Sequence, residues 1–265
     1  MKRFFSIICL SGFLLVGCSR ETTSETPIPS SSTTADSAVS KEEEETTSSS
    51  QEEEPVDQHI AETEKETGLH VVDNPESIEV YVNKQRKLPD GYEPPDLVVP
   101  DVRHRYESGH METHMRKEAA AALEELFAAA EKSGFDLMTI SGYRSFDRQT
   151  VIYNNQVQAK GKEYADQYSA YPGTSEHQTG LTMDVRFADD SKESKLDESF
   201  GETDTGKWLA AHAHEYGFII RYPKGKEAIT GYSYEPWHIR YIGKPLAEEL
   251  FEHHLTLEEH FGFDY

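Results

Sequence analysis

The sequence predicts a single α+β domain of about 190 residues, preceded by a signal segment and a polar tether. Three observations favour this fold class. Strand-like and helix-like segments are mixed along residues 71–265 without a regular strand–helix–strand rhythm. No internal repeat is evident. The two cysteines, Cys9 and Cys18, both lie near the N-terminus, so we expect no disulfide to hold the domain together.

Residues 1–17 have the features of a signal peptide. Lys2 and Arg3 form a positive start, and the apolar stretch 4–16 is too short to span a bilayer as a mature helix. Residues 15–18 resemble the bacterial lipobox. That resemblance implies cleavage before Cys18, lipid attachment to Cys18, and residence on the extracytoplasmic face of the cell membrane. An uncleaved signal anchor and an ordinary signal peptide with a chance cysteine are the alternatives.

Residues 18–70 are rich in Ser, Thr, Glu and Pro and contain almost no aromatic or large aliphatic side chains. Such a segment cannot bury enough apolar surface to offset its ordering entropy, so we predict a disordered tether. The net charge is −23. A surface this acidic argues against nucleic-acid binding and against adhesion to anionic lipid. We expect a monomer that is held to the membrane by its lipid.

The first predicted elements of the domain are a strand, a turn and a long helix. Residues 78–82 alternate like a strand and lead to a turn at 89–91, where Pro, Asp and Gly follow one another. Residues 111–132 are rich in Ala, with large apolar residues at core spacing, and predict a helix. Gly134 is expected to stop it.

A buried strand is predicted at 136–141, followed by a helix that Asp147 caps and that runs to about Lys160. The next strand covers 181–187. Its alternation is clean, and one face carries only large apolar residues, namely Leu181, Met183, Val185 and Phe187. Asp204 or Thr205 opens a further helix that continues to Tyr216 and ends at Gly217, and strands follow at 218–222 and 237–242.

The strand at 181–187 also carries the first candidate for chemistry. If its apolar face is buried, Thr182, Asp184 and Arg186 share the other face. A carboxylate there is costly unless it is paired or bound to metal; an ion pair with Arg186 is the alternative to a metal. On one straight strand His177 would point to the opposite face. Gly180 offers the turn that could bring it back, although an ordinary surface or capping histidine is the alternative reading.

The second candidate segment is Glu235-Pro-Trp-His238. Pro236 interrupts the strand and forces a bend, which allows Glu235 to stand beside a metal bound by His238 without ligating it. Two imidazoles and one carboxylate, from His177, His238 and Asp184, would fill three corners of a zinc tetrahedron. The corner left open for water distinguishes such a catalytic site from a closed structural one.

These two segments match the Ser-x-His-x-x-Gly-x-x-x-Asp pattern (residues 175–184) and the Glu-x-x-His pattern (residues 235–238) of the zinc D-alanyl carboxypeptidase family. That family includes VanY-type D,D-carboxypeptidases and related L,D-carboxypeptidases. The resemblance covers roughly residues 75–265, with further matches at 141–145, 149, 216–218, 221–226 and 230–232. One departure is Thr182, where the family usually has Ala. The resemblance implies the compact fold of the Hedgehog-type peptidases, with a small antiparallel sheet carrying the zinc site.

The resemblance also implies a role for each matched residue. His177, Asp184 and His238 would hold Zn²⁺, and Glu235 would take a proton from the attacking water and deliver it to the leaving amine. Arg144 would bind the terminal carboxylate of the substrate or stabilise the oxyanion, since its planar fork suits both tasks. Further hydrogen-bonding partners of the substrate would be Gln149, Ser175 and Tyr222. The implied reaction is removal of the C-terminal D-alanine from peptidoglycan stem peptides.

Two alternatives stay open at this point. An L,D-enzyme acting on tetrapeptides is favoured over a D,D-enzyme acting on pentapeptides, because the anchored architecture and the segment 221–226 look more like the L,D group. A non-catalytic zinc- or wall-binding lipoprotein of the same fold is a rival from another class. The intact site residues argue against it. We expect His212 and His214 to be one surface and one packing histidine, and Trp208 and Trp237 to belong to the core.

Overall fold

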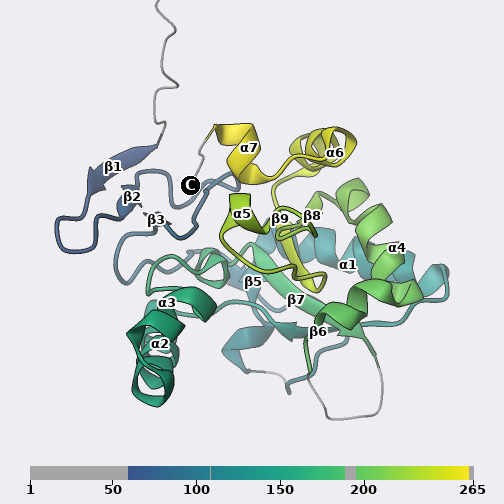
Figure 1. Ribbon diagram of the computed structural model, residues 1–265. Coiled ribbons are helices and arrows are strands. Elements are labelled where there is room, and N and C mark those ends of the chain that lie inside the picture. The colour runs from purple at the N-terminus through teal and green to yellow at the C-terminus, as the bar shows by residue number, and fades with distance from the viewer. Residues whose placement is uncertain (1–58, 108, 189–194, 263–265) are drawn as a thin grey trace, which may run out of the picture. The chain divides into compact units, whose positions relative to one another are not determined.

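A four-stranded antiparallel sheet lies at the centre of the structure, a computed structural model that describes residues 59–107, 109–188 and 195–262 (Figure 1). The predicted signal peptide, Cys18 and most of the predicted tether lie outside these residues. The strand order is β6-β7-β9-β8. The strands are β6 (Leu137–Ser141), β7 (Thr182–Phe187), β8 (Phe218–Ile220) and β9 (His238–Tyr241).

The main core lies on the face of this sheet to which Met183 and Val185 point. These two side chains are fully buried in one cluster with residues of helices α1 (Lys117–Lys132) and α4 (Asp204–His212). The α+β class and the small antiparallel sheet are thus confirmed. Leu181 belongs to the same cluster and Phe187 packs against it, so the alternation predicted for residues 181–187 is confirmed as well.

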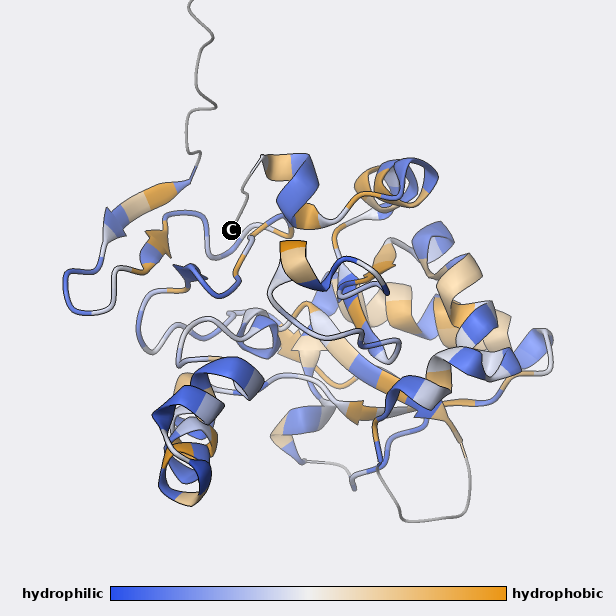
Figure 2. Ribbon diagram, in the orientation of Figure 1, coloured by the Kyte–Doolittle hydropathy of each residue, from blue (hydrophilic) through white to orange (hydrophobic). Residues whose placement is uncertain are grey.

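Helices α2 (Phe146–Lys160) and α3 (Lys162–Tyr168) lie side by side, away from α1 and α4 (Figure 1). Figure 2 shows that α2 is mostly hydrophilic, and it buries only Gln149 and Tyr153. The remaining helices are α5 (Glu227–Thr230), α6 (Lys244–His253) and α7 (Leu257–Phe261). No helix in the described part of the chain combines the length and the apolar character that crossing a membrane requires.

Two small sheets flank the central one. The strands β1 (Ile60–Thr63), β2 (His70–Val72) and β3 (Arg86–Lys87) form the first, and β4 (Leu97–Val98) pairs with β5 (Met115–Arg116) in the second. We expected the globular part to start at residue 71. Ordered structure begins earlier, because β1 pairs antiparallel with β2. Short 3-10 turns lie at Met111–Thr113, Glu176–Thr179, Glu198–Glu202 and Ala213–Tyr216.

The predicted strand at 78–82 is wrong. The segment is buried only from Val80 to Val82 and pairs with no strand; instead, the guanidinium of Arg240 donates hydrogen bonds to the carbonyls of Ile78 and Val80. Val80, Tyr81 and Val82 are all buried, so the alternation of residue types here does not correspond to one buried and one exposed face. The turn at 89–91 is confirmed, with the amide of Tyr92 donating to the carbonyl of Pro89.

Two helix starts also differ from the prediction. The helix expected from Met111 begins at Lys117, because residues Met115–Arg116 pair with β4. Helix α2 is capped by Ser145, whose hydroxyl accepts from the amide of Arg148, and not by Asp147, which lies inside the first turn. Two ends are as predicted, since α1 stops before Gly134 and α2 stops at Lys160. The helix expected to continue to Tyr216 ends at His212 instead, and the 3-10 turn Ala213–Tyr216 that follows it ends at Gly217.

Candidate active site and metal centre

Two of the candidate ligands face each other on neighbouring strands. Strands β7 and β9 are antiparallel, with Asp184 directly opposite His238. Because side chains alternate along a strand, Asp184 points away from the core that takes up Met183 and Val185. Both ligand candidates are nonetheless buried, with 5% of Asp184 and 4% of His238 exposed. Strand register therefore brings together two groups that are far apart in the sequence.

The third candidate, His177, reaches the same site from a 3-10 turn at Glu176–Thr179. Gly180 follows this turn in the left-handed conformation (φ 68°) and returns the chain into β7, as predicted. The ring of His177 is fixed from behind, since its Nδ1 donates to the carbonyl of Gly142 over 2.8 Å. A side chain at Gly142 would lie 2.5 Å from the carbonyl oxygen of His114, so this support is closely packed.

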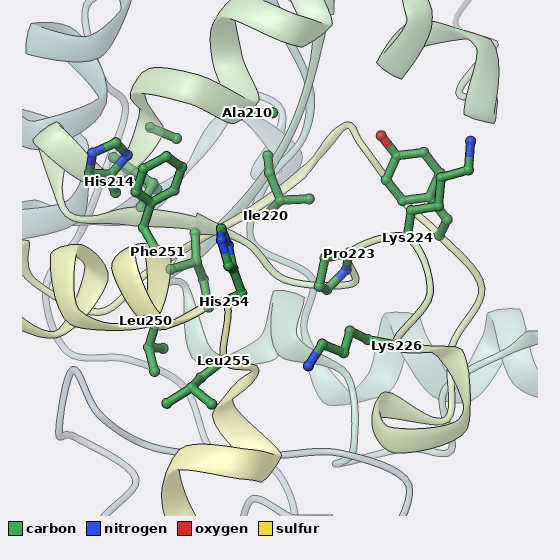
Figure 3. A pocket seen from close by; sticks show the side chains of 14 residues that line it. Ala210, His214, Ile220, Pro223, Lys224, Lys226, Leu250, Phe251, His254 and Leu255 are labelled. Carbon is green, nitrogen blue, oxygen red and sulfur yellow. The ribbon is translucent and has the colours of Figure 1, made fainter. Parts of the chain in front are cut away.

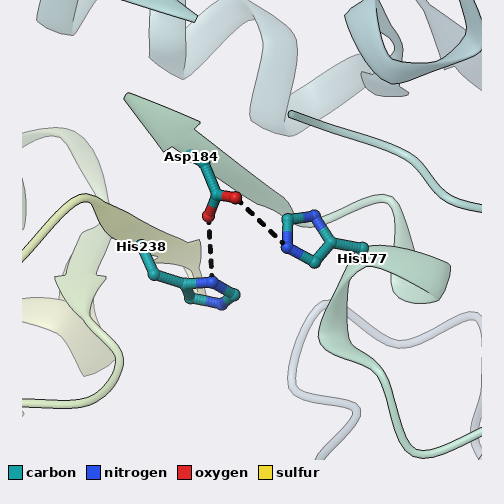
Figure 4. Close-up of side chains that lie close together, drawn as sticks. All are labelled: His177, Asp184 and His238. Carbon is teal, nitrogen blue, oxygen red and sulfur yellow. Dashed lines mark ion pairs between the residues drawn. The ribbon is translucent and has the colours of Figure 1, made fainter. Parts of the chain in front are cut away.

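The geometry of these three side chains suits a metal ion (Figure 4). His177 Nε2 lies 3.5 Å from Asp184 Oδ2, and His238 Nδ1 lies 3.1 Å from Asp184 Oδ1. Donor atoms that bind zinc tetrahedrally at about 2.0–2.2 Å stand roughly 3.3–3.6 Å apart. In addition, Oδ1 of Asp184 is buried and accepts no well-aligned hydrogen bond among the described residues. The donor set and its spacing therefore fit Zn²⁺.

The charges around the cluster are consistent with this use. Burial lowers the pKa of His177 to about 3, so its ring is neutral, as a metal ligand must be. Burial opposes ionisation of Asp184, but the neighbouring His177 and His238 lower its pKa nevertheless. Burial also opposes a charged His238, yet the carboxylates of Asp184 and Glu176 beside its ring raise its pKa to about 9. Metal binding at His238 therefore competes with a proton.

Glu235 stands beside the cluster without belonging to it. Pro236 and Trp237 form the bend that we predicted, and the amide of His238 donates to the Glu235 carbonyl over 3.2 Å. The Glu235 carboxylate lies 3.6 Å from His238 Nδ1. Burial raises the pKa of Glu235 to about 7. A carboxyl group with such a pKa can both accept and give a proton near neutral pH.

A cavity of about 250 Å³ opens onto these groups. His177, Asp184, Glu235 and His238 line it together with Arg144. Burial lowers the pKa of the Arg144 guanidinium, although an arginine stays charged at any working pH. Its Nε is buried and has no hydrogen-bond partner in the described part of the chain. The cavity thus holds a positive fork within the same space as the metal candidates.

Gln149 supports this arginine. Its Oε1 accepts from Arg144 Nη1 over 3.0 Å, and its Nε2 donates to the carbonyl of Ala170 over 2.7 Å. Gln149 therefore holds Arg144 in place; it also lines the cavity, and its contact with a substrate stays a prediction. Ser141 Oγ accepts from the second nitrogen, Nη2, over 3.2 Å.

The other two predicted contacts, Ser175 and Tyr222, also line the cavity, and both are almost fully buried. Ser175 precedes the 3-10 turn that carries His177, and its hydroxyl makes no cap hydrogen bond. The ring of Tyr222 stacks on Tyr232 and lies 4.9 Å from the ring of His238. Both hydroxyl-bearing residues therefore border the space beside the metal candidates.

Sequence reasoning missed two charged residues next to the site. Glu176 lies inside the 175–184 motif and is fully buried against His238, with Oε2 3.4 Å from His238 Nε2. Arg240 pairs with Glu176 over 2.8 Å. A signal existed for Arg240: it is two positions after His238 in one strand and so shares its face, where a buried charge requires a partner.

A larger cavity, of about 420 Å³, shares no lining residue with the first (Figure 3). Its walls are mainly apolar, and His214 stacks on Phe251 with ring centroids 3.6 Å apart. His212 bonds to Glu215 at the surface, so the division into one surface and one packing histidine is confirmed. Because the three metal candidates line only the smaller cavity, we place the chemistry there. Trp208 and Trp237 pack against the core, as expected.

Comparison with known proteins agrees with this site. The family model of the D-alanyl-D-alanine carboxypeptidases (VanY) matches residues 112–244. Among curated relatives, YodJ of Bacillus subtilis (strain 168) is 52% identical over 204 residues, which are 77% of this chain and 74% of YodJ.

Two solved structures are similar over nearly their whole length. The LD-carboxypeptidase LdcB, described for its peptidoglycan recognition, has 51% identity and a TM-score of 0.72, and the match covers 77% of this chain and 94% of LdcB. The D,D-pentapeptidase VanY of a VanB-type vancomycin-resistance cassette, solved in complex with Zn(II), has 32% identity and a TM-score of 0.54, covering 68% and 97%. With its His/Asp/His cluster and these relatives, the chain belongs to the VanY family of D-alanyl-D-alanine carboxypeptidases and is a zinc carboxypeptidase.

Proposed function

We propose that the protein is an L,D-carboxypeptidase that removes the C-terminal D-alanine from tetrapeptide stems of peptidoglycan. The observation that carries this choice is the likeness to LdcB, which exceeds the likeness to the zinc-bound D,D-pentapeptidase in both identity and TM-score. The family itself supports only the coarser statement, a carboxypeptidase acting on the D-alanyl end of peptidoglycan peptides.

In this proposal His177, Asp184 and His238 hold the zinc ion, and Glu235 handles the proton. Zinc supplies Lewis acidity to such a site: it acidifies water and polarises the scissile carbonyl. Glu235 takes the proton of the attacking water and later delivers it to the amine of the departing D-alanine. Its position 3.6 Å from a metal ligand and its pKa of about 7 support both transfers.

Arg144 is proposed to bind the terminal carboxylate of the peptide. Its guanidinium is held by Gln149 and Ser141 on two nitrogens and lines the cavity beside the metal candidates. A planar fork in a fixed position can bind a carboxylate through two hydrogen bonds, and it places the last peptide bond at a constant distance from the metal. Ser175 and Tyr222 are proposed to donate hydrogen bonds to the same end of the substrate.

The substrate register is tested with purified muropeptides. We expect the enzyme to shorten tetrapeptide stems by one alanine and to leave pentapeptide stems ending in D-Ala-D-Ala largely uncut, because the two substrates differ in the stereochemistry of the residue before the scissile bond. Mass spectrometry of both substrates after incubation measures this. Faster cleavage of pentapeptides would identify a D,D-carboxypeptidase instead.

Metal removal tests the catalytic role of zinc. We expect a chelator to abolish turnover and added Zn²⁺ to restore it, because the Lewis acid activates both water and carbonyl. The rate of D-alanine release before chelation, after it, and after zinc addition gives the answer. A non-catalytic wall-binding lipoprotein would release no D-alanine at any of these stages.

We further propose that the protein is anchored by lipid on Cys18 to the extracytoplasmic face of the cell membrane. The lipobox-like residues 15–18 support this proposal. Wild-type protein should incorporate a labelled fatty acid and Cys18→Ala should not, because alanine has no sulfur to which the lipid can be attached. Labelling of cells followed by electrophoresis of the purified protein measures the difference. A C18A protein that carries as much label as wild type would contradict lipid attachment to Cys18.

A further inference from the structure

A cluster of four buried charged side chains lies behind His238, on the side away from Asp184. It consists of Glu176, Arg221, Arg240 and Glu258, each at most 2% exposed. Two carboxylates and two guanidiniums make the cluster neutral as a whole. Charges buried this deeply are tolerated only when they are paired and hydrogen-bonded. The four side chains therefore form one mutually paired cluster, and its Glu176 lies directly against the metal-ligand candidate His238.

The two oxygens of Glu176 have separate tasks. Oε1 accepts from Arg221 Nε and from Arg240 Nη1, each over 2.8 Å. Oε2 faces the site: it lies 3.4 Å from Nε2 of His238 and accepts from the hydroxyl of Thr182 over 3.2 Å. Because the two arginines hold Oε1 from two directions, the position of Oε2 is fixed. Thr182, where the family usually has Ala, contributes to the same fixation.

The two nitrogens of His238 are therefore distinguished by their surroundings. Nδ1 faces Asp184 at 3.1 Å and Glu235 at 3.6 Å, whereas the carboxylate that Nε2 faces within the described part of the chain is that of Glu176. Because Oε2 of Glu176 is the acceptor beside Nε2, a hydrogen on Nε2 is stabilised there, and Nδ1 is the nitrogen that would give up its proton to a metal. Carboxylates commonly orient metal-binding histidines in this manner.

We propose that Glu176, clamped by Arg221 and Arg240, is a positioning residue of the metal centre that keeps the proton of His238 on Nε2 and turns Nδ1 toward the metal. The proposal requires the zinc centre but not the choice between L,D and D,D substrates. Zinc affinity, measured without any peptide, therefore tests it separately from the proposed function.

The support extends to the C-terminal helix. Arg221 donates to both oxygens of Glu258 in α7, over 2.9 and 2.7 Å. The carboxylate of Glu258 thus balances the positive charge of Arg221, and it is not among the partners of His238. This makes Glu258 a matched control, since it is an equally buried carboxylate on the same arginine but is one step farther from the metal ligand.

The first experiment compares the zinc affinity of wild-type protein, Glu176→Gln and Glu258→Gln by competition with a chromophoric chelator. For E176Q we expect affinity to fall by about 10–100-fold, which is the usual effect of removing such an outer partner. For E258Q we expect affinity close to wild type, even if its melting temperature falls. Unchanged affinity of E176Q, or an equal loss in both variants, would show that the cluster only supports the fold.

A second experiment needs no variant and therefore stands even if E176Q does not fold. Zinc-loaded wild-type protein labelled with ¹⁵N-histidine is measured by long-range ¹H–¹⁵N correlation, which reports which ring nitrogen is protonated. We expect His238 to carry hydrogen on Nε2 and the metal-bound signature on Nδ1. The opposite tautomer would overturn the proposal.

Discussion

Replacement of Glu235 by glutamine is expected to abolish peptide hydrolysis while zinc stays bound. Glutamine keeps the size and the position of the side chain but cannot take a proton from water. General acid–base groups contribute about 10²–10⁴-fold to rate, so kcat should fall by that factor. The carboxylate lies beside the metal candidates and outside the His/Asp/His cluster, which is why zinc should remain. D-alanine release and zinc content by elemental analysis are measured on the same preparation.

A suitable control is Glu248→Gln, which neutralises an exposed glutamate of α6 that does not line the cavity. It should be as active as wild type. Loss of zinc from E235Q in step with loss of activity would mean that Glu235 is itself a ligand. Substantial turnover with zinc in place would assign the proton transfers to another group.

Replacement of Arg144 by alanine is expected to remove most activity and to leave zinc in place. The guanidinium lines the cavity but lies outside the His/Asp/His cluster, so its loss affects the peptide and not the metal. Losing a preorganised donor to a developing or terminal negative charge costs about 10²–10³-fold, and we expect that fall in kcat/KM. Steady-state kinetics on a tetrapeptide stem measures it.

Arg144→Lys tests whether the planar fork matters beyond its charge, and we expect only partial recovery because lysine cannot bind a carboxylate in a bidentate manner. Arg148→Ala is the matched control. Arg148 lies four positions later, in the first turn of α2, is largely exposed, and does not line the cavity. Near-normal turnover of R144A with intact zinc would contradict the assignment of Arg144 to the substrate.

Periodicity predicted the central sheet better than the periphery. The strand at 181–187 is strongly marked because one of its faces lies in the core with α1 and α4 and the other carries polar groups, so its pattern follows from its surroundings. Residues 78–82 show a similar alternation, yet their carbonyls accept hydrogen bonds from the side chain of Arg240 instead of a neighbouring strand. Tyr81 is buried there together with Val80 and Val82, so alternation of residue types alone established neither one-sided burial nor a paired backbone.

Local stereochemistry predicted the shape of the site. Gly180 adopts the left-handed conformation that turns His177 back over the sheet, and Pro236 lies in the bend that sets Glu235 beside His238. Both expectations came from single residues with restricted or unusual backbone preferences, which act in the same way in any fold. The hydrogen bonds of Gln149 to Arg144 and to the Ala170 carbonyl, in contrast, depend on residues that only the fold brings together.

The sequence by itself determined the donor types of the metal site, the face of β7 that carries Asp184, and the two bends that bring His177 and Glu235 to it. These depend on side-chain chemistry and on neighbours within a few residues. Only the tertiary structure decided which nitrogen of His238 faces Asp184, and that Glu176 is locked between Arg221 and Arg240. The physical reason is that each buried charge needs an oppositely charged partner nearby. These partners come from strands and helices that are far apart in the sequence, so no local sequence pattern indicates that they will be neighbours.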